Sequence, residues 1–207
     1  MIYEMRTYTL KVGTVPEFET RFAEALTMRE GYSKLGGFWH TEVGTLNQVI
    51  HVWRYDSLQQ RAEIRAAAIK DPSGKWPPKV ADLIITQEVD ILDPVETMEP
   101  WGGPRQWGSI YELRMYTYAP GDAMKVAPAY AAALPKRMEL YPMAGIFTSQ
   151  LGSLNRLYQL SPYRDWAHRE EVRAQFRTTG VWPPKAEARP IEQNVRILIP
   201  STFSPLH

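Results

Sequence analysis

Two histidines in the first half of the chain are the side chains best suited to moving protons. His40 and His51 stand on either side of the stretch Gly-Thr-Leu-Asn at positions 44–47, which has the composition of a turn. A hairpin centred on that turn pairs residues whose numbers sum to 91, so His40 is expected directly opposite His51 on the same face. Because imidazole titrates near neutral pH, His51 and His40 are the candidate catalytic residues.

The same two histidines also admit other roles. A metal ion would need a third ligand, for which Glu42, Glu4 and Glu88 are the candidates, but these residues show no recognised ligand spacing. No metal ligand is therefore assigned. A purely structural pair, in which both imidazoles hydrogen-bond to neighbouring polar groups, stays open and is the simpler interpretation.

A row of polar side chains in the first predicted strand forms a second candidate site. Glu4, Arg6 and Tyr8 alternate along residues 2–9 and share one face, which is expected to line the interior of a closed sheet or to reach a neighbouring strand. Together with Trp53 they are the candidate substrate-binding residues, with the arginine orienting an anionic or carbonyl-bearing ligand. The alternative is a ladder of buried Glu–Arg pairs that fixes the strand register.

The elements that must position these residues occur twice. The segment IYEMRTYTLKVG at 2–13 returns as IYELRMYTYAPG at 110–121, an offset of 108 residues, and WPPK at 76–79 returns at 182–185. These collinear matches indicate a tandem duplication of a unit of about 100 residues, a common domain size. The expected division is a first unit at 1–92, a docked linker rich in Pro, Gly and Trp at 93–109, and a second unit at 110–207.

Each unit is expected to have the order strand, helix, strand, strand, helix, strand. In the first unit, alternating patterns predict the strands and helical spacing predicts helices that begin near positions 14 and 57; the strands are expected at 2–9, 37–43, 48–55 and 85–92. This order is the split βαβ, ferredoxin-like arrangement. One such sheet leaves a face bare, so we expect an α+β protein whose tandem ferredoxin-like (βαββαβ) units form an intrachain α/β barrel of the dimeric type, with helices outside.

Comparing the two copies places the candidate site in the first. At the offset of 108 residues the two histidines are replaced by Thr148 and Gln159, and Trp53 is replaced by Ser161. The joint loss of both histidines is expected if they act as one unit, although packing alone could also produce it. The asymmetry predicts that only the first copy carries the site.

Other notable residues are expected to be structural. Helix arginines retained in both copies are predicted to lie at the surface or to bridge to the sheet: Arg29, Arg61 and Arg65, with Arg137, Arg169 and Arg173. WPPK is predicted to be a rigid plug at an end of the barrel, with the alternative that Trp76 and Lys79 lie at a binding mouth. Pro128 and Pro135 predict a bent first helix in the second copy.

Composition limits the classes of function. The 207 residues carry a net charge of +1 and no cysteine, which argues against a nucleic-acid surface and excludes thiol chemistry. No apolar stretch approaches the ~20 residues of a membrane span. Motifs for phosphate binding, nucleophilic serine or zinc hydrolysis are absent, and no cofactor is expected. Because a strand pattern begins at once, without a leader ahead of it, a cytoplasmic location is expected.

Several of these motifs together resemble one family. YEMRTYTLKVGTVPEF, the Gly-Thr-Leu-Asn turn running into HVWRYDSL, and the repeated YELRMYTYAPG are similar to the NIPSNAP family over essentially the whole chain, the first copy being the closer match. The resemblance implies membership of the dimeric α/β-barrel superfamily, beside cofactor-free monooxygenases, EthD-like proteins and haem-binding or haem-degrading relatives. It also implies an activity that is not established, and eukaryotic relatives associated with mitochondria, vesicle traffic and mitophagy through protein contacts.

The observations support three functional hypotheses. The first is that a barrel pocket in the first copy binds a small hydrophobic or aromatic molecule, with cofactor-free monooxygenase-like or isomerase-like chemistry as an extension. The second is a non-catalytic protein-interaction module. The third and weakest is haem or metal binding through the histidine pair. Association into a homodimer, without nucleic acid or membrane, is expected in each case.

Overall fold

The computed structural model describes residues 1–101 and 103–207, and both units have the predicted order of elements. The first unit comprises β1 (Ile2–Leu10), α1 (Val15–Arg29), β2 (Leu35–Val43), β3 (Gln48–Tyr55), α2 (Leu58–Ile69), a short 3-10 helix η1 (Ala81–Leu83) and β4 (Ile84–Pro94). The second unit comprises β5 (Ile110–Thr117), α3 (Asp122–Leu140), β6 (Gly145–Leu151), β7 (Arg156–Tyr163), α4 (Trp166–Thr179) and β8 (Glu192–Pro200).

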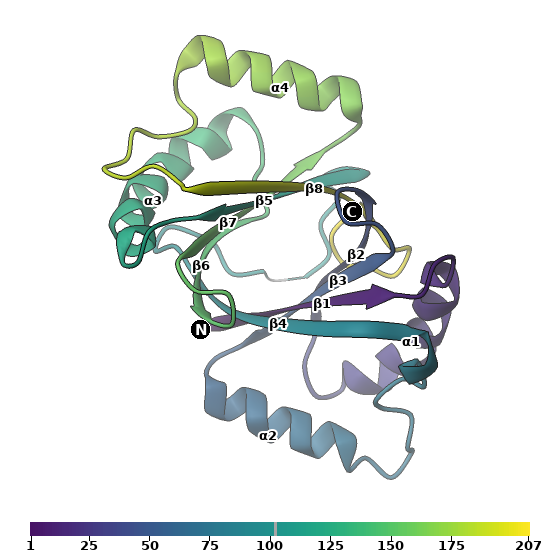
Figure 1. Cartoon of the computed structure of the whole chain (residues 1–207). Helices are drawn as coiled ribbons and strands as arrows, with labels where there is room; N and C mark the ends of the chain where they lie inside the picture. Colours follow the sequence, from purple (N-terminus) through teal and green to yellow (C-terminus); the bar gives the residue numbers. More distant parts are fainter. Residues whose placement is uncertain (102) are drawn as a thin grey trace.

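The eight strands close into a single barrel. Their order is β1-β3-β2-β8-β5-β7-β6-β4, and every neighbouring pair for which a register is defined is antiparallel. Each unit supplies four adjacent strands, and the two half-barrels join where β2 meets β8 and where β4 meets β6. All four helices lie outside, with α1 and α2 on the side of the first unit and α3 and α4 on the side of the second (Figure 1). The predicted intrachain barrel is therefore confirmed.

The interior of the barrel is mainly apolar and is filled by side chains of both units, with a smaller polar set that includes Asp90, Gln48 and Arg196. The main contributors are Tyr3, Met5, Trp39, Ile50, Val52 and Leu92 from the first unit and Tyr111, Leu113, Phe147, Tyr158, Leu160 and Leu198 from the second. The rings of Trp39 and Tyr111 lie 5.4 Å apart between centroids, so the units share one core. Burial of so much aromatic surface is a main source of the stability of the fold.

Glu4, Arg6 and Tyr8 lie on the other face of β1, so the prediction that they line the barrel interior is wrong. Side chains of a strand alternate between its faces, and the set containing Tyr3 and Met5 occupies the interior. The polar set faces outward, where the helices α1 and α2 cover it. A second layer of buried side chains therefore lies between the sheet and the helices of the first unit.

Helix α1 covers this outer face because its apolar residues recur at helical spacing. Phe18, Phe22, Leu26 and Arg29 are all buried against the sheet. Helix α2 begins at Ser57, whose side chain accepts a hydrogen bond from the backbone N–H of Gln60 at 3.1 Å. No helix in the described part of the chain combines the length and the apolar character that crossing a membrane requires.

The segment that follows the last strand of each unit packs on the other unit. After β4, the backbone N–H of Val95 donates to the carbonyl of Ile146, and after β8 the N–H of Ser201 donates to the carbonyl of Phe38 in the equivalent way. Trp101 is buried and donates its indole N–H to the carbonyl of Ala144 at 2.6 Å. The linker therefore docks, as its tryptophans predicted.

Candidate functional site

The hairpin of the first unit has a different register from the predicted one. His40 lies opposite Val49, and His51 lies opposite Phe38 on β2. The two histidines thus share a face of the sheet but are not direct partners. The predicted cross-strand histidine pair is wrong.

A threonine in β2 explains this register. The backbone N–H of Gln48 donates to the Thr41 hydroxyl at 3.2 Å, which closes the hairpin two residues earlier than a turn at 44–47 would. On its other edge β2 pairs with β8, where Thr41 lies opposite Leu198 and Val43 opposite Ile197. The hydrogen bond at Thr41 thus marks the end of the pairing between β2 and β3.

His40 lies near the edge of the layer between the sheet and α1. Its Nδ1 is 2.8 Å from the Glu19 carboxylate, which also accepts a hydrogen bond from the Ser201 hydroxyl at 2.6 Å. The second unit has Thr148 and Ala127 at the equivalents of His40 and Glu19. His40 is therefore lost together with its own acidic partner.

His51 is fully enclosed by the same layer. Its Nδ1 accepts a hydrogen bond from the indole N–H of Trp53 at 2.8 Å. The rings of Tyr8, Phe22 and Phe38 surround it, with centroids 5.1, 5.1 and 5.6 Å away. Because an indole can only donate, Nδ1 must be the acceptor, and in the neutral ring the proton is carried by Nε2. The residue lost with His51 in the second unit is Trp53.

The second ring nitrogen of His51 is buried and has no hydrogen-bond partner among the described residues. Burial, reinforced by the positive charges of Arg6, Arg65 and Arg29, holds the pKa of His51 well below its ordinary value. The imidazole is thus neutral at physiological pH. It presents a donor, Nε2–H, and has no free lone pair with which to act as a base.

His51 is one of the residues that line a cavity of about 290 Å³ between the sheet, α1, α2 and the WPPK loop, which we call the first-unit pocket. Its walls combine aromatic side chains with three arginines: Tyr8, Phe18, Phe22, Trp53, Tyr55 and Trp76, with Arg6, Arg29 and Arg65. Of the six predicted site residues, Arg6, Tyr8, His51 and Trp53 meet here. Glu4 lies behind the wall, and His40 lies outside it.

Glu4 serves as the counter-charge for the arginines behind the pocket wall. Its carboxylate accepts hydrogen bonds from Arg6 at 2.7 Å and from Arg61 of α2 at 2.6 Å, and Arg65 lies 3.6 Å away. Burial alone would raise the pKa of Glu4, but the hydrogen bond from Arg61 and the charges of Arg6 and Arg65 hold it below its ordinary value. Glu112 makes the same cluster with Arg114, Arg169 and Arg173, so this is the Glu–Arg ladder.

Arg29 also lines the first-unit pocket, although the sequence did not predict it as a site residue. It is only 2 % exposed, and its guanidinium lies over the rings of Trp53 and Trp76 at 4.4 and 5.5 Å. It donates to the hydroxyls of Tyr55 and Ser33, both at 2.9 Å. The prediction of a bridge to the sheet is confirmed, and that of a surface position is wrong. The sequence signal for the burial of Arg29 is its helical spacing, because the residue continues the apolar face of α1.

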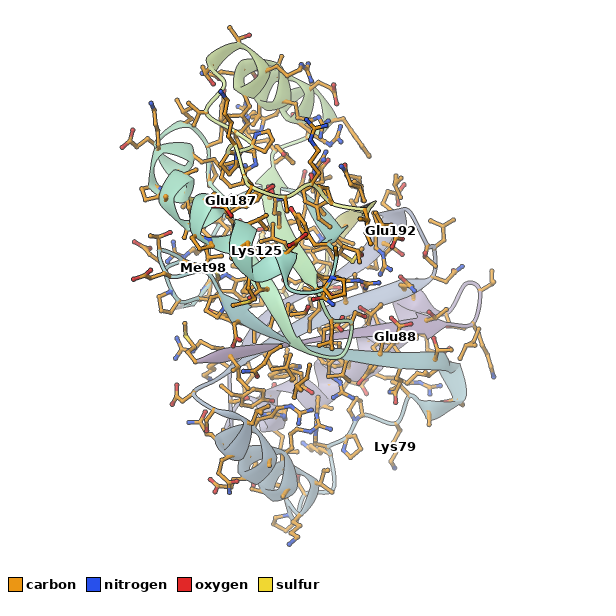
Figure 2. All side chains as sticks on the ribbon, turned by 60° about the vertical axis from the view of Figure 1, so that its left-hand side comes forward. Lys79, Glu88, Met98, Lys125, Glu187 and Glu192 are labelled. Atoms are coloured by element: carbon orange, nitrogen blue, oxygen red, sulfur yellow. The ribbon has the colours of Figure 1, made fainter. Side chains whose placement is uncertain are left out.

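The WPPK loop forms one wall of the pocket. Trp76, Pro77 and Pro78 line it, which corresponds to the alternative placement at a mouth rather than to a plug in the barrel end. Lys79 lies beyond the pocket on the outer loop (Figure 2), where its carbonyl accepts a hydrogen bond from Arg21 at 2.8 Å. Trp76 therefore lies at the pocket, whereas Lys79 does not.

The predicted third metal ligands do not join the histidines. Glu88, labelled in Figure 2, lies opposite Thr7 of β1, on the face away from His51. No group of three or more His, Cys, Asp or Glu side chains arranged to hold a metal ion is found in the parts of the chain that the structure describes.

Sequence relatives agree with this two-unit geometry. The NIPSNAP family model matches residues 3–98 and matches a second time at residues 111–205. The chain belongs to the NIPSNAP family. It is 32% identical to Protein NipSnap homolog 3B of Mus musculus, over 99% of this chain and 85% of that protein. It is 30% identical to the human Protein NipSnap homolog 3A, over 100% of this chain and 86% of that protein.

A more distant solved structure shares the whole barrel. An anthrone oxidase-like protein superposes with a TM-score of 0.59, covering 99% of this chain and 93% of that one at 10% identity. At that identity the likeness shows the fold alone. The resemblance to NIPSNAP proteins drawn from the sequence motifs is confirmed.

Within this NIPSNAP chain, the two units differ at several positions that line the pocket. Gln159 and Ser161 stand at the positions of His51 and Trp53, and Val126 and Tyr130 stand at those of Phe18 and Phe22. Arg137, the equivalent of Arg29, is equally buried and donates to the carbonyl oxygens of Tyr141 and Pro142. The second unit has therefore kept the arginine and several aromatic residues, including Tyr130 and Trp182, but it lacks the imidazole of His51 and the rings of Phe18 and Trp53.

Proposed function

We propose that the first-unit pocket is a binding site for a small molecule with an aromatic or other apolar body. The observation that carries this proposal is a cavity of about 290 Å³ whose walls include the rings of Phe18, Phe22, Trp53 and Trp76. Pockets with apolar walls and a few converging polar groups are the usual form of small-molecule sites. The replacement of Phe18, His51 and Trp53 by Val126, Gln159 and Ser161 in the second unit supports a role specific to the first.

The proposed site includes Arg6, Tyr8, His51, Trp53 and Arg29. His51 would act as a hydrogen-bond donor that stabilises negative charge on the ligand, which is the contribution it could make to cofactor-free oxygenation or isomerisation. It would not act as the base, because its lone pair is engaged by Trp53. A catalytic role for His40 stays a prediction, since that residue lies outside the pocket.

A pocket-blocking substitution tests the proposal. Ala81 lines the pocket and is itself exposed, so Ala81→Phe should fill the mouth without disturbing the core. The matched control is Glu187→Phe, at the equivalent exposed position of the second unit. Binding of 2-naphthoate, a ring of suitable size, would be followed by calorimetry. We expect binding to the native protein and to Glu187→Phe, and its loss in Ala81→Phe. Equal binding by both variants would place the ligand elsewhere and refute the proposal.

A further inference from the structure

The charged side chains that line the first-unit pocket are all cations. None of the described residues that line the pocket is an aspartate or a glutamate, whereas three arginines line it: Arg6, Arg29 and Arg65. The nearby carboxylate of Glu4 is already shared among Arg6, Arg61 and Arg65. Three arginines around one carboxylate leave a surplus of positive charge at the back of the cavity.

Arg29 adds a fourth cation, and it forms no direct ion pair with any of the described residues. Its guanidinium is enclosed by aromatic rings and is bonded only to neutral groups of Ser33 and Tyr55 among the described residues. An arginine remains protonated at neutral pH. A buried cation without an anionic partner is unfavourable unless something else brings the negative charge.

The unpaired nitrogen of His51 gives the same indication independently. Trp53 fixes the imidazole so that Nε2 carries the hydrogen, and this N–H is buried with no acceptor in the part of the chain that the structure describes. Buried donors in folded proteins are nearly always paired, so this one favours a ligand that brings an acceptor. A cationic ligand or one that offers only N–H groups would leave it unsatisfied.

From these observations we propose that the ligand of the first-unit pocket is an aromatic anion whose charged oxygen, of a carboxylate, phenolate or enolate, accepts a hydrogen bond from His51 Nε2–H beside Arg29 and Arg65. This inference rests on the proposed function, and it adds the charge and the acceptor group of the ligand. The ring of the ligand would lie among Phe18, Phe22 and Trp76, and its oxygen would complete both the buried donor and the buried cation.

Three naphthalene probes of similar size test the charge: 2-naphthoate, the neutral ketone 2-acetonaphthone, and the cation of 2-(aminomethyl)naphthalene. Calorimetry on the full chain should show 2-naphthoate binding at least tenfold more tightly than the ketone, and no binding of the cation. Equal affinity for 2-naphthoate and the ketone would overturn this inference and leave the proposed function intact. Failure of all three probes to bind would refute both.

Substitutions then assign the selectivity to named residues. Arg65→Met removes a partly exposed cation, so it should fold, and it should lower the affinity for 2-naphthoate about tenfold while changing that for the ketone less than twofold. Arg173→Met, at the equivalent place in the second unit, is the control and should leave both affinities unchanged. His51→Gln, which installs the residue of the second unit, should also reduce selectivity. Loss of affinity for both probes alike in these variants would contradict recognition of the charged oxygen.

Discussion

Glu4 and His51 are buried on the same face of the first sheet, yet their polar atoms are treated differently. Glu4 is paired by arginines from its own strand and from α2, and its twin Glu112 repeats the arrangement. In His51, Nδ1 accepts a hydrogen bond from Trp53, whereas Nε2 has no partner among the described residues. The first pattern is typical of a framework, since a buried charge has to be compensated. The second is typical of a binding site.

The neutral state of His51 makes the stability of the protein depend on pH. Its pKa is held below the ordinary value of 6.5 in the folded state, so below that pH the unfolded chain takes up a proton that the folded chain does not. Unfolding is then favoured increasingly as the pH falls. We expect His51→Gln to remove this contribution, so that the variant gains up to about 2 kcal/mol relative to the native protein between pH 7 and pH 5.

Urea unfolding of both proteins at the two pH values measures this difference. Acidic groups titrate in both proteins and therefore cancel in the comparison. Parallel pH profiles for the native protein and His51→Gln would show that His51 is protonated in the folded state, contrary to its enclosure by Arg6, Arg29 and Arg65.

At the scale of elements, helix α3 contains a backbone carbonyl without its helical donor, and a side chain from outside the helix supplies the hydrogen bond. Pro135 has no N–H, so the carbonyl of Ala131 lacks its usual helical donor. The hydroxyl of Thr97, in the segment after β4, donates to that carbonyl at 2.6 Å. The helix thus runs uninterrupted from Asp122 to Leu140 through both of its prolines. Pro135 and Thr97 thus act together, and the hydrogen bond from Thr97 joins the segment after β4 to helix α3 of the second unit.

This pairing predicts a non-additive result. Thr97→Val leaves the carbonyl of Ala131 unpaired and should lower the free energy of unfolding by about 1 kcal/mol. Pro135→Ala restores the helical N–H, so in that background Thr97→Val should cost much less. A double-mutant cycle followed by urea unfolding gives the coupling directly. Additive effects of the two substitutions would show that the Thr97 hydroxyl does not replace the missing donor.

The elements themselves were predictable from the sequence, and the registers and faces were not. Strands alternate visibly at 2–9 and at 48–55, and both are present. The hairpin register involves the Thr41 hydroxyl, and the same strand also pairs with β8, which is distant in the sequence. The face of β1 that is interior could not be deduced, because each face carries an aromatic residue and the Glu4 row is covered by helices rather than by solvent.

At the scale of the whole molecule, duplication explains why the barrel could be predicted. Each unit alone exposes one face of its sheet, and the second copy covers it within the same chain. The pocket, by contrast, could not be located, since it depends on where α1, α2 and the WPPK loop meet. Arg29 and Trp76 are retained in the second unit as Arg137 and Trp182. A comparison of the two copies therefore favours a structural role for both residues.

The exchange of terminal segments between the units predicts that the whole chain unfolds as one. Phe203, at the end of the second unit, packs on Phe22 and Phe38 of the first, with ring centroids 5.9 and 4.9 Å apart. It is partly buried, so Phe203→Ala should cost about 2 kcal/mol and lower Tm by roughly 4–8 °C. Because the strands of both units share a closed barrel and one core, tryptophan fluorescence and far-ultraviolet circular dichroism should still report a single coincident transition. Two separated transitions in Phe203→Ala would show that the units unfold independently and that the barrel is less cooperative than its shared interior implies.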